Sequence, residues 1–127
     1  MIPLRIQRDG DLGYSCTTDA EHFVLGHWLE SDVGIHEEGN LAEDLFEEIG
    51  GLLRGDVPSL QIWGNSVRLT ATVDKVLMEM PRPGVAPQST LTLSELVEST
   101  LRWFDVVNPP FAERLREIRR SWPVMRS

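Results

Sequence analysis

Two segments with alternating apolar and polar residues, joined by a short turn, constrain the fold more than any other feature of this sequence. Residues 59–63 and 67–73 flank Gly64-Asn65-Ser66. Glycine and asparagine accept the backbone angles that tight hairpin turns need. In 67–73 the apolar residues alternate with polar ones, as in a strand with one buried face. The pattern predicts a hairpin, and residues 76–80 are expected to extend the same antiparallel sheet.

A second hairpin is predicted near the N-terminus. Ile2, Leu4 and Ile6 alternate with polar residues or proline, residues 9–13 have the composition of a turn, and residues 14–18 can return as the second strand. Residues 22–29 are apolar and aromatic, so we expect a third, central strand there. Gly26 within it would mark a bulge or a close backbone contact.

Three amphipathic helices are predicted in the remaining sequence. Asn40 followed by Glu43 resembles a capping box, apolar residues recur at helical spacing through Leu52, and Gly55 is expected to end this first helix. Thr92 and Glu95 form a second capping box, which opens a helix through residue 107. Residues 108–110 should end that helix and begin a third, because proline is accepted in a first helical turn.

Between the second sheet segment and the second helix, residues 81–89 contain three prolines and one glycine. We expect a long loop there, and a functional flap is one interpretation of it.

The order of these elements indicates an α+β fold. We expect a mainly antiparallel sheet of four to six strands, built from two hairpin units and packed against two to three helices. A length of 127 residues is ordinary for one domain, so we expect a single domain over residues 1–127. Residues 108–127, which are rich in arginine, are expected to form a basic C-terminal helical extension.

The acidic residues are concentrated in the first part of the chain. The net charge is −8, and residues 1–52 hold twelve acidic residues against only Arg5 and Arg8. An acidic surface repels nucleic acid and anionic lipid and attracts basic proteins. We therefore expect a protein partner rather than a nucleic acid or a membrane. The alternative is that the charge serves only solubility.

The chain contains a single cysteine, Cys16. It cannot form an intramolecular disulfide or a zinc site of several cysteines. The N-terminal residues lack the pattern of a signal peptide, and no apolar run approaches the length of a membrane span. We expect a cytoplasmic protein.

No set of residues indicates catalysis. The three histidines, His22, His27 and His36, show no metal-binding spacing, and a nucleophilic pair of Cys16 with a histidine would lack an evident thiolate stabiliser. No glycine-rich phosphate loop is present. We expect a binding protein without metal or cofactor rather than an enzyme.

Acidic residues and two tryptophans are the candidate partner-binding residues. The acids lie in the loop before the first predicted helix and on its polar side, where a merely solvated face is the alternative. Both tryptophans fall out of phase with their neighbouring apolar residues, which fits exposed interface anchors or coverage by a second layer. The set is Glu37, Glu38, Glu43, Asp44, Glu47, Glu48, Trp63 and Trp103.

Three segments resemble the YacL-like family of small uncharacterised bacterial proteins. Residues 23–29 (FVLGHWL), which follow a hairpin containing Arg8-Asp9, resemble the N-terminal part of that family. Residues 60–73 resemble its middle hairpin, and residues 91–98, continuing to 104–107, resemble its C-terminal helix. The proline-rich loop and residues 108–127 depart from it. The resemblance implies a housekeeping or regulatory interaction protein, with a homodimer as one arrangement, and transfers no catalytic residue.

Small acidic proteins of this kind also resemble the immunity proteins of contact-dependent growth inhibition systems. That resemblance implies a cytoplasmic protein that neutralises a cognate toxin, often a basic nuclease. We therefore expect an immunity protein that binds a basic toxin domain, with the YacL-like role as the alternative.

Overall fold

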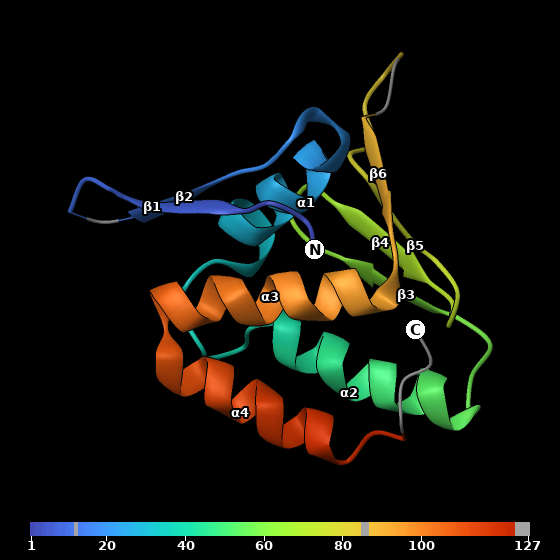
Figure 1. Ribbon diagram of the computed structural model, residues 1–127. Helices are drawn as coiled ribbons and strands as arrows, with labels where there is room; N and C mark the ends of the chain where they lie inside the picture. Colours follow the sequence, from blue (N-terminus) through green and yellow to red (C-terminus); the bar gives the residue numbers. More distant parts are fainter. Residues whose placement is uncertain (12, 85–86, 124–127) are drawn as a thin grey trace.

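The computed structural model describes residues 1–11, 13–84 and 87–123. Over these residues the chain forms four α-helices and two antiparallel sheets, one of two strands and one of four (Figure 1). The expected α+β fold is confirmed. Helices α2 (Leu41–Arg54), α3 (Leu93–Val107) and α4 (Pro109–Arg120) lie together on one side of the larger sheet.

The larger sheet is a meander of four strands in sequence order. Its strands are β3 (Leu60–Trp63), β4 (Arg68–Ala71), β5 (Val76–Glu79) and β6 (Gln88–Leu91). The predicted β3–β4 hairpin and its extension by β5 are confirmed. Strand β6 was not predicted, because its alternation lasts only four residues and adjoins proline. Residues 85–86 of the expected 81–89 loop lie outside the described residues.

One face of this sheet is buried, while the other is open to solvent. Along each strand buried and partly or fully exposed residues alternate, as in a sheet covered on one side only. The open face carries two rows of side chains across the strands. One row is Gln61, Thr70, Leu77 and Thr90, and the other is Trp63, Arg68, Glu79 and Gln88.

The helix ends follow the predicted signals closely. The side chain of Asn40 accepts a hydrogen bond from the amide of Ala42 at 2.8 Å, and α2 ends at Gly55 with a φ of 82°. The capping box of Thr92 and Glu95 is present in both directions, at 2.8 and 3.0 Å. Glu43 does not complete a capping box with Asn40, because its carboxylate pairs with an arginine of α4 instead.

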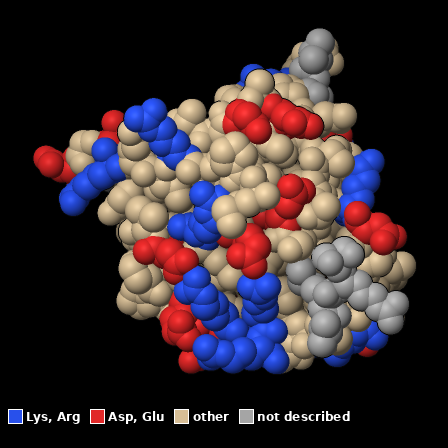
Figure 2. Space-filling view, in the orientation of Figure 1, with Lys and Arg blue, Asp and Glu red and all other residues tan. Residues whose placement is uncertain are grey.

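Helix α4 is part of the core. Phe111, Ala112 and Leu115 are buried, and the Phe111 ring packs edge-on against Phe104 of α3 with 4.6 Å between centroids. Figure 2 shows arginine side chains gathered over α4, interleaved with acidic ones. Of the predicted basic extension 108–127, residues 108–123 are described and pack against α2 and α3; the last four lie outside the described residues.

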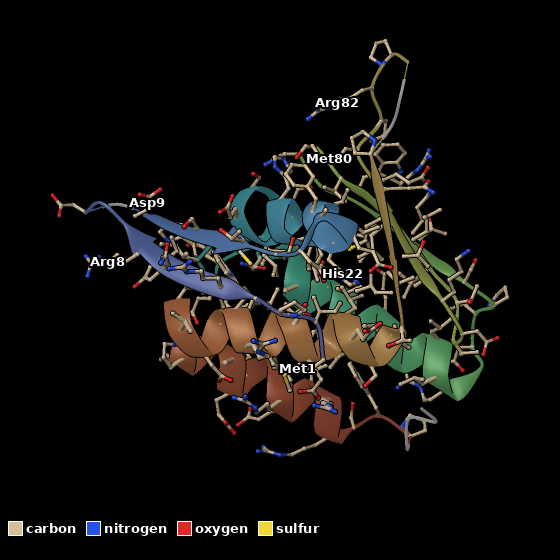
Figure 3. The ribbon with its side chains drawn as sticks, turned by 45° about the horizontal axis from the view of Figure 1, so that its top comes forward. Met1, Arg8, Asp9, His22, Met80 and Arg82 are labelled. Carbon is tan, nitrogen blue, oxygen red and sulfur yellow. The ribbon has the colours of Figure 1, made fainter. Side chains whose placement is uncertain are left out.

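The predicted N-terminal hairpin is confirmed, but it forms a separate two-stranded sheet rather than part of one sheet with the second hairpin. Strands β1 (Arg5–Asp9) and β2 (Gly13–Thr17) pair in register from Arg5 opposite Thr17 to Asp9 opposite Gly13. The hairpin projects from the body of the molecule, with Arg8 and Asp9 toward its tip (Figure 3). Residue 12 of its turn lies outside the described residues.

The expected central strand over residues 22–29 is wrong, because this segment is helical. A 3₁₀ turn (η1, Ala20–His22) leads into α1 (Phe23–His27) and then into a π-helical turn (η2, Trp28–Val33). The buried residues Val24, Leu25, Trp28 and Leu29 repeat with helical rather than two-residue spacing. Gly26 does mark a close contact, since a β-carbon there would lie 3.0 Å from the Cys16 carbonyl oxygen.

Candidate functional site

Trp63 is the largest exposed apolar side chain of the described residues. It stands at the end of β3 on the open face of the sheet, with 58% of its surface exposed. The guanidinium of Arg68 lies 5.2 Å from the indole centroid and is itself paired with Glu79 at 2.9 Å. A cation over the face of an aromatic ring attracts that ring. Arg68 therefore holds one face of the Trp63 indole, while the rest of the side chain stays exposed.

Trp103 does not have the exposure that an interface anchor needs. Only 1% of its surface is exposed, and its Nε1 donates a hydrogen bond to the carbonyl oxygen of Gly34 at 2.8 Å. The alternative interpretation, coverage by a second layer, is the correct one for this residue. The spacing along α3 did not predict this burial, because α3 contacts the loop at Gly34 as well as α4, so its buried surface is wider than a single stripe.

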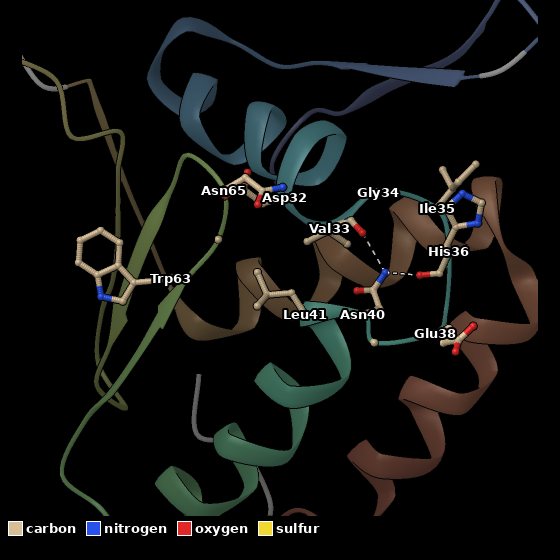
Figure 4. Close-up of a pocket in the computed structure, with 12 residues that line it drawn as sticks. Asp32, Val33, Gly34, Ile35, His36, Glu38, Asn40, Leu41, Trp63 and Asn65 are labelled. Carbon is tan, nitrogen blue, oxygen red and sulfur yellow. Dashed lines mark hydrogen bonds between the residues drawn. The ribbon is translucent and has the colours of Figure 1, made fainter.

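Two hollows flank the turn that follows Trp63. The first, of about 350 Å³, is lined by Trp63, Gly64 and Asn65 on one side and by residues 32–36 and 38–41 on the other (Figure 4). Among the described residues that line it, the charged ones are Asp32 and Glu38, with no lysine or arginine. We call it the acidic hollow.

The second hollow, of about 360 Å³, lies on the other side of the same turn. It shares Trp63, Gly64 and Asn65 with the acidic hollow and is completed by His27, Ser66 and residues 80–82. Its described lining residues include one cationic side chain, Arg82, and no carboxylate. The indole of Trp63 thus borders two hollows of different charge.

The turn between the hollows is clamped by one carboxylate. Asp32, at the end of the π-helical turn, accepts hydrogen bonds from the amide of Val67 at 2.8 Å and from the amide and hydroxyl of Ser66 at 3.2 and 2.9 Å. The turn itself is closed by the Gly64 amide, which donates to the Val67 carbonyl at 2.9 Å. These bonds hold the backbone beneath Trp63 in one position.

The opposite wall of the acidic hollow is equally well fixed. Each carbonyl oxygen from Val33 to His36 accepts a hydrogen bond from a side chain. Asn40 Nδ2 donates to Val33 at 2.9 Å and to His36 at 2.6 Å, Trp103 donates to Gly34, and Asn108 Nδ2 donates to Ile35 at 3.0 Å. Sequence reasoning missed this wall, because the donors lie up to 73 residues away along the chain.

The six predicted acids occupy different places. Glu38 lines the acidic hollow with Trp63, whereas Glu37 is exposed in the same loop without lining either hollow. Asp44, Glu47 and Glu48 are exposed on α2.

Glu43 is not a free acid. Its carboxylate accepts a hydrogen bond from Arg114 Nε at 2.7 Å, and this hydrogen bond raises the pKa of Arg114. The predicted acidic face of α2 is therefore partly neutralised by α4. The sequence contained no signal that α2 and α4 are neighbours.

A chain of three polar residues beneath the turn superficially resembles a catalytic set. His27 Nε2 lies 3.0 Å from Ser66 Oγ, and Ser66 Oγ donates to Asp32 Oδ1 at 2.9 Å. In a nucleophilic triad the histidine stands between the serine and the carboxylate and takes the serine proton. Here the serine stands in the middle and its proton is directed to Asp32, so the arrangement braces the turn.

Two other groups with chemical potential lie away from the hollows. Cys16 is buried, and desolvation together with the nearby Glu30 carboxylate raises the pKa of its thiol to about 11, which opposes thiolate formation. Asp19, Glu21 and His22 bring their ligand atoms within 4.8 Å of one another. Asp19 already caps the His22 amide at 3.1 Å and contacts its imidazole at 2.6 Å.

Among the described residues, no helix combines the length and apolarity that crossing a membrane requires. No known protein family, curated protein or solved structure matches this chain.

Proposed function

We propose that this chain is a protein-binding protein whose binding surface is centred on Trp63 and the acidic hollow beside it. The observation that carries the proposal is the exposure of Trp63, at 58%, on rigid backbone between two hollows. Tryptophan is enriched among the residues that dominate binding energy at protein interfaces, especially where it stands beside recesses that a partner can fill.

The chemistry of the hollow favours a basic partner. Within the described part of the chain, Asp32 and Glu38 are its only charged lining residues, and the whole chain carries a net charge of −8. A lysine or arginine of the partner could place its alkyl stem along the Trp63 indole and its cation near these carboxylates. The exposed acids of α2 would add long-range attraction, which raises the association rate more than the affinity.

The surface is also organised before any partner arrives. Asp32 fixes the turn that carries Trp63, and side-chain donors fix every carbonyl of the facing loop from Val33 to His36. A rigid site avoids the entropy cost of ordering loops on association. This supports tight binding by a small contact surface.

Among basic protein partners, we propose a toxin domain, so that the chain acts as an immunity protein. A small acidic binder with a preformed anchor suits the neutralisation of a basic enzyme by occlusion. A YacL-like regulatory role would use the same surface on a different partner.

The test examines the genes beside the one for this chain and uses any toxin domain that they encode. Co-expression should rescue growth, and calorimetry should show that Trp63→Ala weakens binding about 30-fold, as expected for loss of a central anchor worth about 2 kcal/mol. The matched control is Val106→Ala, which truncates another exposed apolar residue and should change the affinity less than about twofold.

Two outcomes would count against different parts of this proposal. Rescue and binding that are insensitive to Trp63→Ala would overturn the assigned surface. Failure of the neighbouring domain to bind, or the lack of any toxin gene beside this one, would overturn the immunity role.

A further inference from the structure

The projecting hairpin has one covered edge and one open edge. On the outer side of β2, the amide of Cys16 donates to the Glu30 carboxylate, and Gly26 of α1 approaches the Cys16 carbonyl. On the other side, the outward backbone groups of Arg5–Asp9 have no hydrogen-bond partner among the described residues. Figures 1 and 3 show this hairpin extending away from the helices. An open strand edge is a template for pairing with another strand.

The charges on β1 differ from those of the surrounding chain. Arg5 and Arg8 are the only basic residues among the first 52, and both lie on this strand with their side chains exposed. Asp9, also exposed, ends the strand. Charged residues on an edge strand normally discourage pairing. Whether they do so here depends on which residues of a second strand stand opposite them.

Two copies of β1 are complementary when they pair antiparallel about Gln7. That register places Arg5 opposite Asp9 of the second copy, and the two-fold symmetry produces the same pair twice. Opposite charges placed directly across a strand pair stabilise it, whereas like charges destabilise it. We propose that β1 is an interface between two copies of this chain, which join their hairpins into a four-stranded antiparallel sheet.

The neighbouring registers are less favourable. A shift that centres the pairing on Arg8 sets two arginines directly opposite each other. A shift that centres the pairing on Ile6 sets Asp9 opposite Pro3 of the second copy. The carboxylate then loses its basic partner, and proline supplies no amide donor. Side chains alternate between the two faces of a β-strand, so a shift by a single residue would bring one face of β1 beside the opposite face of the second copy. The charges therefore select the register centred on Gln7.

The same register suits the other face of the hairpin. Ile6 and Tyr14 are partly buried against the core, and Arg8 of β1 stands directly opposite Tyr14 of β2. Pairing about Gln7 places Arg8 of the second copy opposite Ile6, so that its alkyl stem covers the isoleucine. The two copies thus bury apolar surface on one face and join charges on the other.

The interface is small, since two five-residue strands bury less than the roughly 1,200 Å² of a stable complex. The association should therefore be weak and concentration-dependent, and added salt should weaken it because the ion pairs are exposed. It uses none of the residues of the Trp63 surface, so the two proposals stand or fall separately.

Sedimentation equilibrium of the full chain from micromolar to millimolar concentration tests the proposal. Arg5→Asp and Asp9→Arg should each weaken self-association about tenfold or more, since each substitution turns both attractive pairs into repulsive ones. An equimolar mixture of these two variants should associate again, because each supplies the charges that the other needs. The matched control is Asp11→Arg, which makes the same charge change in the hairpin turn and should leave the association constant within about twofold.

Three outcomes would overturn the proposal. They are a monomer at millimolar concentration, self-association that Arg5→Asp leaves unchanged, and a mixture of the two variants that stays monomeric. Far-ultraviolet circular dichroism of each variant shows whether the fold is intact. The single variants and the mixture contain the same folded proteins, so recovery in the mixture cannot arise from refolding.

Discussion

The carboxylate of Asp32 lies so close to Gly64 that a β-carbon on this glycine would sit 2.2 Å from Asp32 Oδ2. No side chain fits in that space, so the contact between the π-helical turn and the β3–β4 turn requires glycine at position 64. The clamp that positions Trp63 therefore requires that the next residue, Gly64, has no side chain.

Gly64→Ala should displace the Asp32 carboxylate and loosen the turn. We expect a loss of about 1–3 kcal/mol in the free energy of unfolding, the usual cost of inserting a carbon into filled space, measured by urea denaturation. The control is Gly51→Ala, where the nearest atom would lie 4.0 Å from the new carbon. That position is inside α2, so alanine should be neutral or stabilise the protein by up to about 1 kcal/mol. Equal effects of the two substitutions would contradict the clamp.

Trp103→Phe and Trp63→Phe make the same chemical change in a buried and an exposed place. At position 103 the change leaves the Gly34 carbonyl without its donor, so we expect about 1–3 kcal/mol of destabilisation. At position 63 the stability should change by less than about 0.5 kcal/mol, because the residue is exposed and phenylalanine still offers a ring face to Arg68. Thermal or urea unfolding of both variants checks the difference, and a reversed order would show that Trp103 is not a core residue.

The buried thiol of Cys16 should make stability depend on pH in the alkaline range. Its pKa is raised from 9.0 to about 11 in the folded chain, so the folded state holds the proton more tightly than the unfolded state. The stabilisation is complete below pH 9 and is lost as the pH rises from 9 to 11. Urea denaturation at pH 8 and pH 10.5 should show a smaller decline for Cys16→Ala than for the parent chain.

The same raised pKa predicts low reactivity. Native protein at pH 8 should react with a thiol-specific disulfide reagent far more slowly than protein unfolded in guanidinium, where the thiol is accessible and more acidic. Equal rates in the two states would contradict the burial of Cys16.

The exposed acids of α2 should govern how fast the proposed basic partner arrives. Reversing Asp44, Glu47 and Glu48 together should lower the association rate more than it raises the dissociation rate, and the difference should shrink at high salt. Glu38→Gln, inside the acidic hollow, should instead act mainly on dissociation. Surface plasmon resonance at two salt concentrations separates the two effects. An association rate that the triple reversal leaves unchanged would show that α2 is not part of the binding surface.

Signals that act within a few residues could be read from the sequence. Thr92 and Glu95 predicted where α3 begins, Gly55 predicted where α2 ends, and Gly64-Asn65 predicted the β3–β4 turn. The phase of Trp63 within β3 marked it as a candidate anchor but left coverage by a second layer open, and the structure shows the side chain exposed. Residues 22–29 were misassigned because a short apolar run is compatible with either a buried strand or a buried helix.

The parts of the candidate site that sequence reasoning missed depend on distant pairs. Asp32 and Ser66 are 34 residues apart, and Trp103 and Gly34 are 69 apart. Nothing in the local pattern around Asp32 distinguishes it from the other acids. Only the packing of α1, which leads into η2, against β5 and β6 brings its carboxylate to the turn.

The side chains that hold the turn beneath Trp63 are not the side chains that would contact a partner. Asp32 holds the turn through the amides of Ser66 and Val67, and the indole takes no part in these bonds. The residue at position 63 can therefore change without altering the scaffold, and so can Glu38 and Arg82 at the outer borders of the two hollows. A lineage built on this arrangement could acquire new partners through a few surface substitutions, while its folding stability stays the same.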